Sequence, residues 1–247
     1  MILTHNDADG LAAGAILARS FSRAGRNARV RILGRGENPW SRAMRGELAE
    51  ETLGGLIVAD LGVRAGPIAE GVPTLIVDHH VPQGEPGDAM VISGHGLTPT
   101  PTSSLLAFWC GGALGPVGDL LWIAAMGIIG DLGDKAEFEE LALACKRYGV
   151  TALRAATALV NAPRRSASGD ARPAFDLLMK ADGPRDLVSG RHEETAILQK
   201  AREEVNAAVQ AGRRVAPRIK GDVALIRLHS PCQIHPLVAQ SWRGRLK

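Results

Sequence analysis

Short apolar stretches of strand length alternate along the chain with segments in which apolar residues recur at helical spacing. Residues 1–4 predict a strand, and small and apolar residues recur at helical spacing from Ala8 to Arg23. The runs 55–60 and 73–80 are continuously apolar until they end in acid or imidazole, as in strands buried on both faces. Such alternation predicts an α/β fold with a doubly wound, mainly parallel sheet and helices on both faces.

The remaining pattern supplies further elements of the same fold. Polar and apolar residues alternate over 28–33, which predicts another strand, and 89–93 predicts one more. Residues 163–173 are basic and small, so we expect a flexible loop there. Helices are expected over 40–51, 102–110, 117–130, 137–148 and 151–160, and 117–130 is apolar all round, as in a buried helix.

The last quarter of the chain has a different pattern. Residues 187–213 are charged with one apolar side, which predicts a linker helix. Two short strands joined at Gly221 and Asp222 follow, and no closing element is expected after them. We therefore divide the chain into a first domain over 1–186, a linker helix over 187–213, and a short or incomplete second α/β domain over 214–247.

Acidic and imidazole side chains stand where the apolar runs end. Parallel strands of an open sheet present their carboxyl ends at one edge, where ligands bind, so these side chains are expected to converge. The buried helix over 117–130 is followed by two acids, of which Asp131 is preferred and Asp134 is the alternative. The candidate residues at the strand ends are His5, Asp7, Asp9, Asp60, Asp78, His79 and His80.

This set of side chains favours a metal site. Ionised carboxylates that crowd together repel one another unless a cation neutralises them. Carboxylates with imidazoles and no cysteine suit Mn²⁺ better than Zn²⁺ or Ca²⁺, and Mg²⁺ is the alternative. There are more acids than one ion needs, whereas two ions about 3.5–4 Å apart would use them and activate a water for phosphoester hydrolysis.

Each motif also has a purely structural interpretation. An Asp-x-Asp pair often belongs to a turn, and an Asp at the end of a strand often caps the next helix. Cys110, Cys145 and Cys232 have neither metal-site spacing nor the density of a disulfide framework. Because acids and imidazoles recur at four segment ends of one α/β pattern, the purely structural interpretation is the weaker one.

Composition and charge narrow the class of partner. The 247 residues are 45% hydrophobic and 22% charged, as in a globular protein, and carry a formal net charge of +3. Arginine clusters such as Arg164-Arg165 suit phosphate. Only 4% of the residues are aromatic, which favours short substrates over a long single-strand groove. No signal peptide or membrane span is expected, since the longest apolar stretch, 120–129, is too short, and the predicted location is the cytoplasm.

The motifs resemble, in order, those of the DHH phosphoesterase superfamily, in its RecJ-like branch. His5 to Gly10, the strand-ending Asp60, the triplet Asp78-His79-His80 and the pair Gly130-Asp131 carry the resemblance, which covers about residues 1–185. The tail is similar to the start of the DHH-associated domain. The Gly-Gly-His segment with which that domain binds the far end of the substrate does not appear before Lys247.

The resemblance implies a role for each residue. Asp7 would bind one metal ion, Asp9, His79 and Asp131 the other, and Asp60 would bridge the two. His80 would face the substrate phosphate, and Asp78 would orient the histidines. His5 is an additional expected ligand.

We therefore expect a two-metal, Mn²⁺-type phosphoesterase acting on phosphodiester or phosphomonoester bonds of nucleotides or short single-stranded oligonucleotides. One alternative is a RecJ-like single-strand-specific exonuclease. Another, from a different class, is a non-catalytic binding module that retains metal. A homodimer is the expected assembly if the chain is not a monomer.

Overall fold

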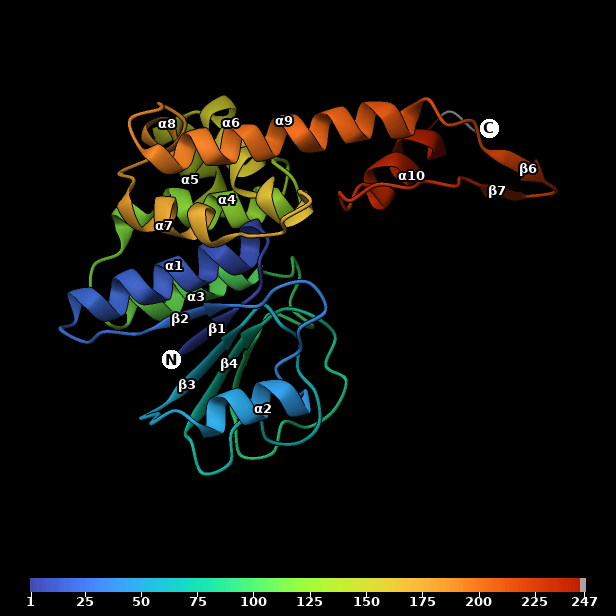
Figure 1. The fold of residues 1–247 in the computed structure, drawn as a ribbon. Coiled ribbons are helices and arrows are strands. Elements are labelled where there is room, and N and C mark those ends of the chain that lie inside the picture. The colour runs from blue at the N-terminus through green and yellow to red at the C-terminus, as the bar shows by residue number, and fades with distance from the viewer. Residues whose placement is uncertain (245–247) are drawn as a thin grey trace.

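The centre of the molecule is a five-stranded parallel sheet, seen in a computed structural model that describes residues 1–244 (Figure 1). The strand order is β2-β1-β3-β4-β5, so the chain starts near the middle and winds outward in both directions. This confirms the predicted doubly wound α/β fold. The strands are β1 (Ile2–Thr4), β2 (Val30–Ile32), β3 (Leu56–Ala59), β4 (Thr74–Asp78) and β5 (Met90–Ser93).

The register of the strands brings the predicted site residues to one edge. Thr4 pairs with Ala59, and Ala59 pairs with Val77, so the strands β1, β3 and β4 end side by side. Two further hydrogen bonds extend the ladder: the N–H of His5 donates to Ala59 at 3.3 Å, and the N–H of Asp60 donates to Val77 at 3.1 Å. The residues that follow each strand therefore meet in space although they are far apart in sequence.

Helices cover both faces of the sheet, as predicted. On one face, α1 (Ala8–Arg23), α3 (Ser103–Gly112) and α4 (Leu121–Asp131) form a core with Ile2 and Ala59. On the other face, Met44 and Leu48 of α2 (Arg42–Ala49) pack with Leu3, Val58 and Ile76 (Figure 1). Neighbouring strand residues such as Ile2 and Leu3 point to opposite faces, so both faces need apolar cover.

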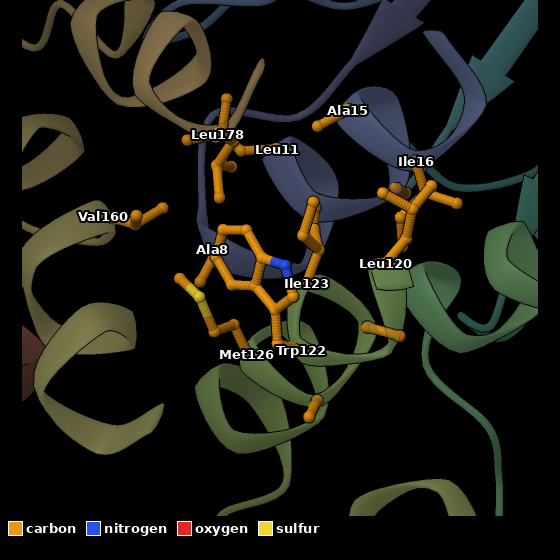
Figure 2. Close-up of a cluster of buried hydrophobic side chains, with 14 of the residues drawn as sticks. Ala8, Leu11, Ala15, Ile16, Leu120, Trp122, Ile123, Met126, Val160 and Leu178 are labelled. Carbon is orange, nitrogen blue, oxygen red and sulfur yellow. The ribbon is translucent and has the colours of Figure 1, made fainter. Parts of the chain in front are cut away.

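The apolar helix α4 is the centre of the larger core. Trp122 is fully buried, and Figure 2 shows it among side chains from α1, with Met126 and Ile123 of its own helix nearby. Apolar contact on all sides explains why this helix lacks a polar face. Because α4 is packed against apolar side chains on all sides, the position of its last residue, Asp131, is fixed relative to the sheet.

The helices that follow α4 build a second layer over α1 and α4 (Figure 1). Of these, α5 (Glu139–Tyr148) and α6 (Val150–Val160) contact α4, α7 (Arg172–Lys180) contacts α1, and α8 (Pro184–Leu187) contacts α6. The short 3₁₀ turns are η1 (Gly118–Leu120) and η2 (Pro163–Arg165). Residues 163–173, expected as a flexible loop, form a loop over 166–171 that is flanked by η2 and by the first turn of α7, with Pro163, Ser166 and Ala171 buried. The segment is thus packed against the first domain and carries Arg164 toward the site.

The long helix α9 (Glu193–Arg213) lies along the second layer and continues beyond it (Figure 1). Leu198 in its first half is buried in the main core, whereas Val205 and Val209 in its second half belong to a separate small cluster. The predicted hairpin is present as β6 (Arg218–Lys220) and β7 (Val223–Leu225), paired antiparallel. The proposed domain boundaries stay predictions.

The expectation that no closing element follows the hairpin is wrong. Helix α10 (His235–Arg243) packs its buried Val238 against the second half of α9. Pro236 stands in the first turn of α10, where the missing N–H of a proline costs no hydrogen bond.

Within residues 1–244, no helix combines the length and apolar character that a membrane span requires.

Candidate active site at the carboxyl edge of the sheet

The first motif turns from β1 into α1 around Asp7. Asp7 is the N-cap of α1, and its Oδ1 accepts a hydrogen bond of 3.0 Å from the N–H of Gly10. The turn is tight, since a Cβ atom on Gly10 would lie 2.7 Å from the carbonyl oxygen of His5. His5 Nδ1 lies 3.0 Å from the other oxygen of Asp7, Oδ2. The glycine therefore allows imidazole and carboxylate to meet within a single turn.

Asp9 lies where two helices begin. It belongs to the first turn of α1, and its carboxylate also accepts hydrogen bonds from the N–H groups of Ser103, at 2.8 Å, and Ser104, at 3.0 Å, in the first turn of α3. The positive ends of two helix dipoles thus face one buried acid. These contacts fix the direction of both carboxylate oxygens.

Asp60 follows β3 in an unusual backbone conformation, with a φ of 62°. Among residues 1–244 it is the single non-glycine residue with positive φ, and aspartate is one of the residues that tolerate this region. Ser103 Oγ donates to Asp60 Oδ1 at 2.9 Å. Asp60 Oδ2 lies 3.5 Å from His5 Nδ1, whereas Oδ1 lies 3.5 Å from His79 Nε2, so the two oxygens face different histidines.

The third motif ends β4 with a buried acid and two divergent imidazoles. Asp78 is fully buried and accepts hydrogen bonds of 2.7 Å from the N–H groups of Gly62 and His80, and its Oδ1 lies 3.0 Å from His80 Nδ1. His79 instead directs Nε2 at carboxylates of the other motifs. Asp78 therefore holds His80 by a direct hydrogen bond, and it also ties the loop after β3 to the end of β4.

The fourth motif brings Asp131 to the site. Asp131 Oδ2, at the end of α4, lies 3.3 Å from His79 Nε2. Asp134 forms an ion pair with Arg154 instead. Of the two alternatives left by the sequence, Asp131 lies beside the other candidate residues and Asp134 does not.

The side chains are suited to hold divalent metal ions. His79 Nε2 is buried and has no hydrogen-bond partner, although Asp131, Asp60 and Asp9 surround it at 3.3–3.9 Å. Ligands of an octahedral ion with bonds of about 2.1 Å lie about 3 Å apart, so these contacts have the spacing of shared coordination. Three groups have donor atoms within 4.8 Å of one another: His5, Asp7 and Asp60; Asp60, His79 and His80; and Asp9, His79 and Asp131.

The charges of this cluster shift its pKa values strongly. Burial and the nearby charge of Asp60 raise the pKa of Asp9 to about 8. Burial opposes protonation of His79, but its contact with Asp60 and the charges of Asp9 and Asp131 outweigh this and raise its pKa to about 9. In the same way, Asp60 and Asp7 raise the pKa of His5 to about 10 against the effect of burial. Without a cation, the cluster therefore retains protons that a metal ion would displace.

Three residues that contact the candidate ligands were not predicted as members of this cluster. Ser103 and Ser104 appear in the sequence as part of a helix cap, yet they orient Asp9 and Asp60. Arg164 Nη1 donates to Asp7 Oδ2 at 2.7 Å and, with His5, holds the pKa of Asp7 well below its usual range against the effect of burial. The sequence signal for Arg164 was only its membership in an arginine pair. The ligand assignment of the whole cluster stays a prediction.

Similarity to known proteins is detected at the level of the structure. No protein-family model matches the sequence, and no curated protein matches it. Solved structures do match: an exonuclease RecJ bound to manganese has a TM-score of 0.68 at 20% identity over 86% of this chain and 63% of that one. RecJ from Thermus thermophilus in complex with Mn²⁺ has a TM-score of 0.63 at 20% identity, over 86% of this chain and 36% of that one.

The DHH domain of a protein described as a member of a family of ribosomal proteins matches with a TM-score of 0.67 at 14% identity, over 99% of this chain and 68% of that one. The chain spans less than two thirds of the length of the two RecJ structures. At these identities the likeness concerns the fold. The chain therefore has a RecJ-like fold, which it shares with that DHH domain.

Proposed function

We propose that the protein is a metal-dependent phosphoesterase that hydrolyses phosphodiester or phosphomonoester bonds of nucleotides or short single-stranded oligonucleotides. The observation that carries the proposal is the position of Asp60 between two sets of ligand atoms. Its Oδ2 lies 3.5 Å from His5 Nδ1, in the group with Asp7, whereas its Oδ1 lies near His79 and His80. A carboxylate with one oxygen toward each set is suited to bridge two cations.

We assign Asp7 and His5 to one ion, Asp9, His79 and Asp131 to the other, and Asp60 to both. Bound there, two divalent cations would supply a Lewis-acidic site that activates a water and neutralises charge on the phosphate oxygens. Oxygen and nitrogen ligands without sulfur favour Mn²⁺, with Mg²⁺ as the alternative. The RecJ neighbours are described in complex with Mn²⁺ or with Mg²⁺.

His80 is suited to contact the substrate phosphate. Its side chain is 54% exposed, and Asp78 holds Nδ1, which leaves Nε2 as the ring nitrogen available to a phosphate oxygen. The hydrogen bond to Asp78 raises the pKa of His80 and so favours the protonated, cationic ring. We propose that His80 binds a phosphate oxygen or donates a proton to it, and that Asp78 positions the ring.

Arg164 would change its contacts with the state of the site. Its Nη1 lies 2.7 Å from Oδ2 of Asp7 and compensates the charge of that carboxylate. A cation bound by Asp7 would take over that role, and the guanidinium would then be available for an anion. This is consistent with a substrate that carries phosphate.

Two alternative functions can be distinguished from the proposed one by direct tests. RecJ-like exonuclease activity is the first, because RecJ structures share the fold, and it predicts degradation of long end-labelled single strands. A non-catalytic binding module is the second, and it predicts bound metal without turnover.

We further propose that residues 214–247 belong to a substrate-binding domain. Homodimer formation and a cytoplasmic location stay predictions.

The central experiment measures hydrolysis of bis(4-nitrophenyl) phosphate by metal-stripped protein to which Mn²⁺ is returned. We expect turnover only with the cation. Asp60→Asn should reduce kcat/KM by more than the about 10–100-fold typical of losing an outer-sphere partner of a metal ligand. The matched control is Asp119→Asn, which removes an exposed acid paired with Arg23 and should leave activity unchanged. Stoichiometric Mn²⁺ binding without turnover would contradict the proposal and favour the binding module.

A further inference from the structure

A cavity of about 640 Å³ lies at the amino edge of the sheet. The first residues of four neighbouring strands line it, namely Ile2 of β1, Leu56 of β3, Thr74 of β4 and Met90 of β5. In a parallel sheet this edge is opposite to the strand ends that carry the candidate ligands, and Figure 1 shows the N-terminus beside it. At about 3.3 Å per residue, Thr74 is about 13 Å from Asp78 along β4. The cavity is therefore separate from the candidate active site, and its volume is within the about 300–1,000 Å³ of small-molecule sites.

A row of apolar side chains crosses the sheet at this edge. Ile2 pairs with Ile57, which pairs with Leu75, and Leu75 in turn pairs with Met90. Residues paired in this way point to the same face of the sheet, and all four line the cavity. Ile2 is fully buried in the core that α1 forms with the sheet, whereas Met90 is 68% exposed. The helices on this face therefore cover one end of the row and leave the other end open.

Arg26 brings a positive charge to this cavity. It follows α1, and its N–H donates to the carbonyl oxygen of Phe21 at 2.9 Å, so its backbone is held against the end of that helix. Gly25 allows the turn, with a φ of 72° that glycine adopts readily. Within residues 1–244 Arg26 takes part in no ion pair, whereas Arg23 and Arg29 each pair with an acid. Neither aspartate nor glutamate is among the described residues that line the cavity. A positive charge beside an apolar surface is complementary to a ligand with an apolar body and one negative charge.

We propose that this cavity binds an apolar carboxylate of the fatty-acid class. The apolar row would bury the chain of the ligand, since large exposed apolar surfaces mark binding sites. The guanidinium of Arg26 would pair with the carboxylate through two N–H donors, and the amide of Asn27 offers a further donor. Met90 has an unbranched, flexible side chain that adapts to the shape of a ligand. The inference is independent of the proposed phosphoesterase activity, because none of the candidate metal ligands lines this cavity.

The test measures by calorimetry, in Mn²⁺ and below the concentration at which micelles form, the dissociation constants of decanoate, decan-1-ol and acetate. Decanoate has both the chain and the charge, decanol has only the chain, and acetate has only the charge. We expect decanoate to bind about tenfold more tightly than decanol, as for a hydrogen bond to a charged group. Acetate, which reports on binding of a carboxylate to the metal site, should not compete with decanoate. Absent binding of decanoate, equal affinities of decanoate and decanol, or competition by acetate would overturn the inference.

Two variants, each with a matched control, locate the bound decanoate. Arg26→Gln should lower the affinity for decanoate to that for decanol, whereas Arg45→Gln, which changes an exposed arginine of α2 outside the cavity, should retain the preference. Met90→Glu places a negative charge in the cavity and should weaken decanoate binding by about tenfold or more. Leu143→Glu is its control, because Leu143 is an exposed apolar residue of α5 outside the cavity.

An unchanged preference in Arg26→Gln, or wild-type affinity for decanoate in Met90→Glu, would place the ligand elsewhere and overturn the inference. Analytical ultracentrifugation tests the other occupant of an apolar surface, a second copy of the chain. A dimer that Met90→Glu dissociates, together with absent binding of decanoate, would assign the surface to that second copy and would equally overturn the inference.

Discussion

The carboxylate of Asp9 accepts a hydrogen bond of 3.0 Å from the backbone N–H of Ser104, which joins the first turns of α1 and α3. This contact is possible because α4 passes close by at a glycine. A Cβ atom on Gly127 would collide with Ser104 Oγ and would lie 2.5 Å from Asp9 Oδ1. The site geometry thus depends on a residue of α4 that carries no functional group.

Gly127→Ala should therefore destabilise the protein and weaken its metal site. Overpacking of this kind costs about 1–3 kcal/mol, and the displaced Asp9 should bind Mn²⁺ less tightly. Urea unfolding and a Mn²⁺ titration measure the two effects. Gly46→Ala is the control, because a Cβ atom there meets nothing within 4 Å, and in a helix the change should stabilise by about 0.5–1 kcal/mol. Wild-type stability and Mn²⁺ affinity in Gly127→Ala would refute this account.

The convergence of the candidate residues at the edge of the sheet could be predicted from the sequence, whereas the packing contacts around them could not. Asp60 and His79 follow apolar runs, and because parallel strands end at one edge, their convergence was predictable. The contacts of Ser103 with Asp60 and of Arg164 with Asp7 were not predicted, because they join α3 and η2 to the turns after β3 and β1, which no local pattern encodes.

The helices α7 and α10 were not predicted from the sequence, and both have a proline in the first turn. Pro173 and Pro236 lie in segments whose sequence favours loops, yet both stand in the first turn of a helix. A proline is compatible with that turn, since its absent N–H would have no partner there. The apolar contacts that complete these helices, such as that of Val238 with α9, are visible only in three dimensions.

Separate asparagine substitutions of Asp131, the last residue of α4, and of Asp134 should show which of the two acids belongs to the metal site. Asp131→Asn removes a carboxylate that lies 3.3 Å from His79, so we expect loss of one Mn²⁺ per chain and of Mn²⁺-dependent hydrolysis. Asp134→Asn removes only an exposed pair with Arg154 and should leave the stability of the protein nearly unchanged, because exposed ion pairs contribute little. Metal content by mass spectrometry and kcat/KM provide the readouts. An inactive Asp134→Asn beside an active Asp131→Asn would reverse the assignment.

Stability of the metal-free protein should fall as the pH rises. The pKa of His79 is raised to about 9 and that of Asp9 to about 8, so the folded state binds more protons than the unfolded state between the ordinary and the raised values. The free energy of unfolding therefore decreases with rising pH, through Asp9 from about pH 4 to pH 8 and through His79 from about pH 6.5 to pH 9. Urea unfolding in EDTA across this range measures the effect. Saturating Mn²⁺ should flatten the dependence, and a rise in stability with pH in EDTA would contradict the proposed origin.

Binding of Mn²⁺ near neutral pH should release protons. At pH 7 the metal-free cluster holds protons on His5, with a pKa of about 10, on His79, with a pKa of about 9, and on Asp9, with a pKa of about 8. Each must lose its proton to bind a cation, so the apparent affinity should increase with pH, by about tenfold per unit for each proton displaced. Calorimetry in Tris and in HEPES should therefore give different binding enthalpies, because the released protons are taken up by buffers of different ionisation enthalpy. His79→Gln should release fewer protons, and identical enthalpies in the two buffers would show that the ligands are already deprotonated.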